Sequence, residues 1–100
     1  MYEIPVAIKR NIKKYDGFVA LGCVIKGETP HFDFICSSVF SSILDLSINY
    51  NKPIGNGIIT ALNMSQAINR SVKNKKDKSN KGSESANAVV MILKNEPKKI

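Results

Sequence analysis

The sequence predicts an α/β fold built on a parallel sheet. Two short apolar runs, Phe18–Ile25 and Ile54–Thr60, have the length and composition of strands. The first run is apolar at odd and even positions alike, which is typical of a strand buried on both faces of a parallel sheet. A long helical pattern separates the runs, and two strands joined through a helix imply a right-handed crossover.

Composition and length restrict the class of protein. The chain has 100 residues, 43% hydrophobic and 23% charged, which excludes a disordered tail and predicts one domain over residues 1–100. No apolar run approaches the roughly 20 residues of a membrane span, and the start MYEIP does not resemble a secretory signal. Cys23 and Cys36 lie in apolar segments without metal-type spacing, so we expect reduced core thiols in a cytoplasmic protein.

The first helix is predicted before the first strand. Its apolar stripe recurs at helical spacing, and Asp16-Gly17 ends it before the buried strand Phe18–Ile25 begins. Pro5 suits the first helical turn. The stripe consists of Ile4, Ile8, Ile12 and Tyr15.

The turn after the first strand is the most informative stretch. Gly27 frees the backbone, Thr29 is a good N-cap and Pro30 a good first helical residue. We therefore expect a helix from here to about Tyr50, with its N-terminus over the carboxyl end of the strand. Ligands bind at that place in open α/β sheets, and free N–H groups there favour an anion such as phosphate. The inner stripe of this helix is Ile35, Val39, Ile43 and Leu46.

The second strand is expected over Ile54–Thr60, interrupted by Gly55 and Gly57. Asn63 is the predicted cap of a third helix, with Gln66 in the capping-box position. The apolar side of this helix consists of Ala67, Ile68 and Val72.

A polar, Lys-rich loop is predicted over 73–82. Ser83 or Asn80 starts the last helix, and Pro97 ends it. One face of this helix carries Ala86, Val89, Val90 and Leu93.

Charge is concentrated near the C-terminus. The formal net charge is +7, and six basic residues lie between Arg70 and Lys81 against Asp77. Such a run is usually a solvated loop, and its alternatives are a nucleic-acid patch or a small anion site that uses one or two of the charges. Because no aromatic residue is interleaved at 70–81, stacking on bases has no support, and nucleic-acid binding is the weakest of the three.

The strand-end turn also carries the chain's only histidine. His31 has a side chain suited to proton transfer near neutral pH, although a surface or capping histidine is the more common finding. Glu28 is either a second acid–base group or an acid favoured near a helix start. Arg70 either grips a phosphate or faces water. No motif for a metal, a P-loop or a dinucleotide is present, so metal chemistry is not expected.

The segment from Leu21 to Asp33, LGCVIKGETPHFD, resembles the signature of the 6,7-dimethyl-8-ribityllumazine synthase family. Tyr2-Glu3-Ile4-Pro5 resembles the aromatic-Glu-aliphatic-Pro motif of that family, and Pro53 to Thr60 resembles its second-strand motif. Gln66 to Arg70 and Asn80 to Gly82 resemble its last two motifs in the right order. The resemblance covers essentially the whole chain.

This resemblance implies a flavodoxin-like three-layer sandwich with a parallel sheet. It also implies a transferase of riboflavin biosynthesis that condenses 5-amino-6-(D-ribitylamino)uracil with 3,4-dihydroxy-2-butanone 4-phosphate and releases phosphate. No cofactor or metal is needed. Members of the family assemble as pentamers or sixty-subunit shells with active sites between subunits, so a homo-oligomer that binds small molecules is implied, without nucleic acid or membrane.

The resemblance also assigns roles to individual residues. His31 matches the catalytic proton-transfer histidine. Residues that match the pyrimidine-binding positions are Tyr2, Glu3, Cys23, Val24, Ile25 and Asn56, the last from a neighbouring subunit and often Phe in the family. Residues that match the positions binding the butanone phosphate are Glu28, Thr29, Arg70 and Lys81, with Arg70 from the neighbour.

Two departures from the family pattern are expected to matter. The strand, helix and strand that usually precede Tyr2-Glu3 are missing, so the chain is interpreted as the C-terminal two-thirds of the usual domain, N-terminally truncated. The strand Phe18–Ile25 then has an open apolar edge, and little lumazine formation is expected from the isolated chain. The spacing from Arg70 to Lys81 is longer than usual. The alternative to an active enzyme is therefore an inactive remnant that acts at most as a binding or structural protein.

Overall fold

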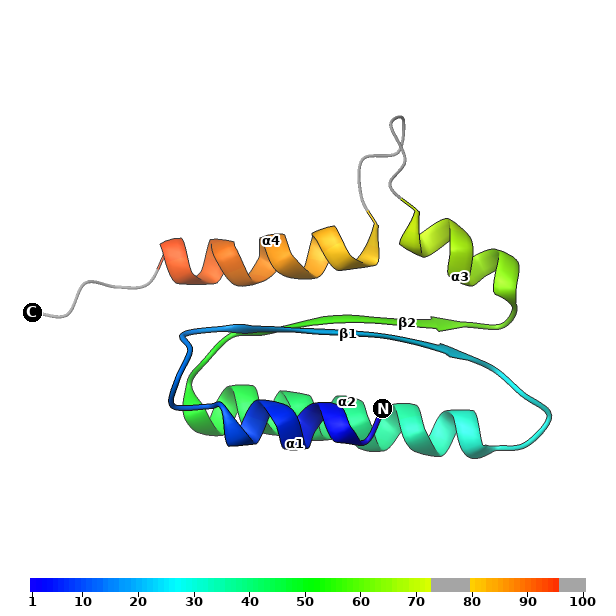
Figure 1. The fold of residues 1–100 in the computed structure, drawn as a ribbon, viewed down its shortest axis with the longest axis horizontal. Coiled ribbons are helices and arrows are strands. Elements are labelled where there is room, and N and C mark those ends of the chain that lie inside the picture. Colours follow the sequence, from blue (N-terminus) through cyan, green and yellow to red (C-terminus); the bar gives the residue numbers. More distant parts are fainter. Residues whose placement is uncertain (73–79, 96–100) are drawn as a thin grey trace, which may run out of the picture.

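The structure is a computed structural model that describes residues 1–72 and 80–95. Helices cover both faces of a two-stranded sheet, with α1 and α2 on one face and α3 and α4 on the other (Figure 1). The predicted α/β class with three layers is confirmed. The elements are α1 (Glu3–Arg10), β1 (Phe18–Ile25), α2 (His31–Tyr50), β2 (Ile54–Ala61), α3 (Met64–Ser71) and α4 (Lys81–Lys94).

The two strands pair in parallel, as the crossover through α2 predicted. The register runs from Phe18 opposite Ile54 to Ile25 opposite Ala61. Backbone hydrogen bonds continue just past both ends, from Phe18 N to Pro53 O (3.0 Å) and from Lys26 N to Ala61 O (2.8 Å). The ladder therefore brings the loop after β1 and the loop after β2 to the same end of the sheet, where both candidate site segments lie.

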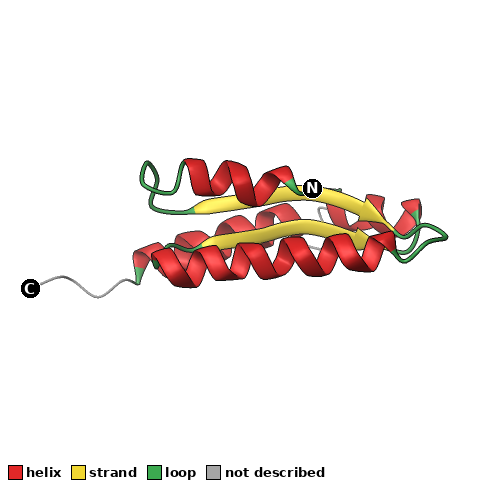
Figure 2. Ribbon diagram, turned by 90° about the horizontal axis from the view of Figure 1, so that it is seen from below, coloured by secondary structure: helices red, strands yellow, loops and turns green. Residues whose placement is uncertain are grey.

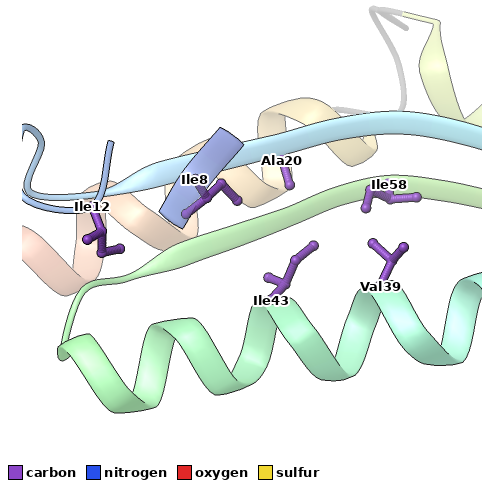
Figure 3. Close-up of a cluster of buried hydrophobic side chains, with 6 residues drawn as sticks. All are labelled: Ile8, Ile12, Ala20, Val39, Ile43 and Ile58. Carbon is purple, nitrogen blue, oxygen red and sulfur yellow. The ribbon is translucent and has the colours of Figure 1, made fainter. Parts of the chain in front are cut away.

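The main core fills the space between the sheet and the helices α1 and α2 (Figure 3). Val39 is fully buried and faces Ile58 across this layer. The predicted inner stripe of α2 is confirmed, because Ile35 and Leu46 pack against the same cluster. The buried members of the cluster are Ile8, Ile12, Ala20, Val39, Ile43 and Ile58.

The predicted burial of β1 on both faces is wrong. Val19, Leu21 and Cys23 are exposed, and only Ala20 is buried. These three side chains point to the face covered by α3 and α4, and both helices pack mainly on β2, so they leave β1 largely uncovered on that face. Among the described residues β1 has β2 on one side and no strand on the other (Figure 2). Cys36 is a buried free thiol as expected, whereas the prediction of a core thiol at Cys23 is wrong.

The glycines of β2 do not interrupt the strand, which is continuous to Ala61. Gly55 and Gly57 instead allow α4 to approach the sheet, because a β-carbon at Gly57 would lie 2.7 Å from the hydroxyl oxygen of Ser85. Ser85 is buried and its hydroxyl donates to the Gly82 carbonyl oxygen at 2.9 Å. Helix α4 is therefore seated against the part of β2 that lacks side chains.

The helices on the first face begin and end slightly differently from the prediction. Helix α1 ends at Arg10, and Tyr15 lies beyond it, exposed, with its ring edge-on to Phe18 at 6.0 Å. Helix α2 starts at His31, so Pro30 is the N-cap residue rather than the first helical residue. Thr29 still contributes, because its hydroxyl oxygen accepts a hydrogen bond from His31 N at 3.4 Å.

Asparagine caps define the helices on the second face. The side-chain oxygen of Asn63 accepts from Gln66 N (2.9 Å), which confirms the predicted cap of α3, and Asn80 accepts from Ser83 N (2.8 Å) at the start of α4. Asn80 and not Ser83 is thus the cap. Residues 73–79 of the predicted loop and Pro97 lie outside the described residues, whereas Lys81 and Gly82 belong to α4. Ile68, Val72 and Val90 are exposed rather than inward-facing, and Ala67 and Val89 are buried as predicted.

One helix meets the length and hydropathy of a membrane span. Helix α2 has 20 residues and a mean hydropathy of 1.2 over its most apolar window, although polar residues interrupt its apolar pattern. A single helix of this kind is weak evidence, because the core helix of a water-soluble domain passes the same test. Here Cys36, Val39 and Ile43 of α2 are buried against the sheet.

Candidate functional site

The first part of the candidate site is the loop from β1 into α2. Glu28, Thr29 and His31 are all exposed there, one after another along the chain. Pro30 makes no side-chain cap, so Thr29 provides the hydroxyl contact at this helix start. The open N–H groups at the start of a helix attract anions, and His31 lies beside them with a side chain that transfers protons.

The second part is a cavity of about 630 Å³ along β2. It brings together Asn56, Arg70 and Lys81, three residues that the resemblance assigns to substrates. Its walls come from β2, from α3 and α4 on one side, and from Phe40 of α2 on the other. The complete lining is Phe40, Asn56, Ile58, Ile59, Thr60, Asn69, Arg70, Lys81 and Glu84.

Local structure orients the polar groups of this cavity. The Arg70 guanidinium donates from Nη1 to the Thr60 carbonyl oxygen, which fixes the arginine at the end of β2. The Asn56 side-chain oxygen accepts from Ile58 N at 3.1 Å, so its NH₂ group is oriented as a donor. Lys81 is the first residue of α4, and the Asn80 cap sets its position. The cavity thus has a pre-positioned set of hydrogen-bond donors.

The charge of the cavity favours an anion. Arg70 and Lys81 contribute two positive charges against the single carboxylate of Glu84. Arginine carries five N–H donors in a fork that matches phosphate oxygens, and the contact with Thr60 involves only one of its terminal nitrogens. Phe40 and Ile58 add an apolar wall suited to a flat ring.

The remaining predicted residues lie on α1 and in the second half of β1. Tyr2 and Glu3 are exposed at the start of α1, where the Glu3 carboxylate pairs with the N-terminal ammonium of Met1 at 2.8 Å. The hydrogen bond from this ammonium lowers the pKa of Glu3 below its usual value. Cys23 is exposed, whereas Val24 and Ile25 are half-buried beside it.

The structure therefore divides the predicted residues into separate groups. Asn56, Arg70 and Lys81 share the cavity, and none of the predicted residues from the loop after β1 lines it. Three polar lining residues were not among the predicted site residues, namely Thr60, Asn69 and Glu84. Asn69 is adjacent to Arg70 in the Gln66–Arg70 motif, and Glu84 lies about one helical turn after Lys81. Their spacing from these two basic residues is the sequence feature that could have identified them.

Metal-ligating side chains do not gather in the part of the chain that the structure describes. No group of three or more His, Cys, Asp or Glu residues there has the geometry to hold a metal ion. Most of the basic residues between Arg70 and Lys81 fall within 73–79, outside the described residues. The cavity therefore contains the two described cations of that basic segment.

Comparison with known proteins identifies relatives over nearly the whole chain. The 6,7-dimethyl-8-ribityllumazine synthase of Bartonella tribocorum is 43% identical over 94 residues, which cover 91% of this chain and 60% of that protein. The protein of the same name from Afipia carboxidovorans is 39% identical over 99 residues, covering 92% and 59%. That from Corynebacterium kroppenstedtii is 44% identical over 68 residues, covering 68% and 43%.

The chain spans about half the length of these curated relatives. The family model described as 6,7-dimethyl-8-ribityllumazine synthase matches residues 1–96, which include both parts of the candidate site. The chain therefore belongs to the 6,7-dimethyl-8-ribityllumazine synthase family.

Proposed function

We propose that the chain acts as a lumazine synthase in riboflavin biosynthesis, condensing 5-amino-6-(D-ribitylamino)uracil with 3,4-dihydroxy-2-butanone 4-phosphate. The observation that carries this proposal is the cavity that gathers Asn56, Arg70 and Lys81. One substrate is a phosphate ester and the other a flat, hydrogen-bonding ring. A positively charged cavity with an amide donor and an apolar wall fits both.

The chemistry needs charge compensation and proton transfer. The amine of the pyrimidine attacks the ketone, and water leaves as the imine forms. Loss of a proton beside the imine then expels phosphate and leaves an enol, which tautomerises to a ketone. The second nitrogen attacks this ketone and closes the ring, and its oxygen leaves as another water. Arg70 and Lys81 offset the charge of the departing phosphate, and His31 moves the protons. Glu28 and Thr29 hold the phosphate ester at the start of α2.

We propose that the complete site forms between two copies of the chain. His31 does not line the cavity of its own chain, which supports a site in which one copy provides His31 and the next provides Arg70. Tyr2, Glu3, Cys23, Val24, Ile25 and Asn56 then surround the pyrimidine. The assembly is a pentamer or a larger shell, without cofactor, metal, nucleic acid or membrane. Two free cysteines support a cytoplasmic location.

The test supplies both substrates to the 100-residue chain and follows lumazine formation by absorbance. His31→Ala is expected to remove turnover while leaving binding of the butanone phosphate intact. Arg70→Ala is expected to weaken that binding. Arg10→Ala removes an equally exposed arginine at the end of α1 and should change neither property. Turnover that survives both His31→Ala and Arg70→Ala contradicts the proposal.

A second candidate function is binding without turnover. It is favoured because the matched segments cover only 43% to 60% of the relatives' length. The two functions differ in a calorimetric titration. An inactive chain that binds the butanone phosphate in an Arg70-dependent way supports the second candidate, whereas an inactive chain without such binding contradicts both.

A further inference from the structure

The turn between β2 and α3 is closed by two hydrogen bonds that both involve Gln66. Its side-chain oxygen accepts from Leu62 N at 2.9 Å, and Gln66 N donates to the side-chain oxygen of the Asn63 cap at 2.9 Å. In a capping box the third helical residue reaches back to the cap residue itself, whereas Gln66 reaches one residue further, to Leu62. Because β2 ends at Ala61, this bond ties α3 to the residue that directly follows the strand.

The same helix carries Arg70 to the end of β2. Arg70 follows Gln66 by four residues, so the two side chains lie on the same side of α3, one turn apart. Gln66 contacts Leu62, and Arg70 contacts the carbonyl oxygen of Thr60. As the helix advances, its partners therefore move back along the chain, which matches the way α3 folds back over the end of β2 (Figure 1). Two bonds thus attach the two ends of this short helix to one stretch of backbone.

Apolar packing alone defines the position of α3 only weakly. Ala67 is the buried residue of this helix, and it packs with Ile59 and Ala61 of β2. Met64 and Ile68 are exposed in the described part of the chain. A single alanine buries little apolar surface, so it limits the distance of α3 from the sheet but hardly its tilt. The orientation of the helix therefore depends on the hydrogen bonds at its start.

This orientation matters because Arg70 has a long, exposed side chain. Holding an arginine in one place costs rotamer freedom, and the position of the helix decides which places its guanidinium can reach. Gln66 is not among the residues that line the cavity. It can therefore act on a bound ligand only through Arg70, and its effect should vanish when Arg70 is removed.

We propose that Gln66 is a positioning residue for Arg70, because its bond to Leu62 N sets the start of α3 against the end of β2 and so holds the guanidinium at the cavity. This role rests on the proposed function, in which Arg70 binds phosphate. Without the bond, α3 samples orientations in which Arg70 does not reach the ligand. The apparent affinity for phosphate then falls in proportion to the fraction of chains that remain competent.

A double-mutant cycle separates positioning from a general loss of structure. Gln66→Met keeps the side-chain length and the helix propensity but removes the acceptor oxygen. It is expected to weaken binding of inorganic phosphate about fivefold in isothermal titration calorimetry, and to have no further effect in an Arg70→Ala background. Ser65→Ala is the matched control at an exposed position in the same turn of α3, and it should leave the affinity unchanged. Far-UV circular dichroism confirms that each variant is folded.

A second variant tests the hydrogen bond itself. Gln66→Glu retains an acceptor oxygen at the same distance from the backbone, so it is expected to recover part of the affinity lost in Gln66→Met. The titration is made at about 0.15 M ionic strength, where the added charge is largely screened. Absence of this recovery overturns the proposal.

The outcomes also distinguish the positioning role from the proposed function. An unchanged affinity in Gln66→Met, or equal losses with and without Arg70, overturns the proposal and leaves Arg70 in the phosphate site. An unchanged affinity in Arg70→Ala overturns the phosphate-binding role of Arg70, and the positioning role with it.

Discussion

The carbonyl oxygen of Ser85 lies so close to Gly55 that a β-carbon on Gly55 would be 2.4 Å from it. Val89 closes the same space at 3.0 Å. The contact joins α4 to β2 through backbone rather than side chains, and neither glycine of β2 has a positive φ. Gly55 is therefore required by close approach and not by its conformational freedom.

Gly55→Ala is expected to destabilise the protein by about 3 kcal/mol, because a backbone carbonyl cannot move aside without shifting α4. Chemical denaturation followed by circular dichroism measures the change. Gly27→Ala is the control, since a β-carbon added at Gly27 would have no neighbouring atom within 4 Å, and this variant should be nearly neutral. Similar losses in the two variants would disprove the close-approach explanation.

Asn80→Ala is expected to lower the free energy of unfolding by about 1 kcal/mol, because the first turn of α4 loses the acceptor for Ser83 N. Asn87→Ala, at an exposed position inside the same helix, is expected to be neutral or slightly stabilising since alanine favours helix. Equilibrium unfolding in urea compares the two. Equal effects would show that the cap does not stabilise α4.

Arg70→Ala is expected to weaken binding of inorganic phosphate by about tenfold or more, because charge-assisted hydrogen bonds in the cavity are lost. Arg70→Lys retains the charge but not the fork and should bind with intermediate affinity. Isothermal titration calorimetry at fixed ionic strength gives the affinities. Full affinity in Arg70→Ala would remove the arginine from the site.

The two cysteines are expected to react at different rates with a thiol reagent. Cys23 is exposed and should react in the folded protein, whereas buried Cys36 should react only on unfolding. A stopped-flow assay in the presence and absence of denaturant separates the two thiols. Cys23→Ser is expected to abolish the fast phase, and a fast phase that persists would contradict the burial of Cys36.

Cys36 also predicts a pH dependence of stability. Burial, followed by the nearby charge of Asp33, raises the pKa of Cys36 above its ordinary value of 9.0. A raised pKa means that the folded state favours the neutral thiol. The unfolded state therefore loses this proton more readily, and the free energy of unfolding falls as the pH rises above the ordinary pKa of cysteine. The stability advantage of wild type over Cys36→Ala is therefore constant at lower pH and should decrease from pH 8 to pH 10. A constant difference across this range would contradict the shift.

The strands and the crossover could be predicted because they depend on local composition. The apolar run Phe18–Ile25 corresponds to β1 residue for residue, and Asn63 caps α3 as its side chain predicts. The exposure of Leu21 could not be predicted from composition, because it depends on which element lies beside the strand. Gly57 was misinterpreted as an interruption since the sequence does not reveal the distance to Ser85.

The candidate site was predicted only in part. Its residues were recognised through the family resemblance, and the structure groups Asn56, Arg70 and Lys81 in one cavity. Composition alone could not distinguish Arg70 from any solvated arginine, because its role depends on the carbonyl of Thr60 ten residues earlier. Thr60 and Glu84 could not be singled out either, because polar residues near the ends of strands and helices are common.

The parallel ladder has a consequence for the kinetics of folding. Every pair joins residues 36 positions apart, from Phe18 with Ile54 to Ile25 with Ala61, so no short hairpin can start the sheet. The chain must close the loop that contains α2 before any rung forms, and this entropic cost precedes any gain from pairing. Folding is therefore expected to be slow for a chain of this length, and substitutions that stabilise α2 alone should accelerate it.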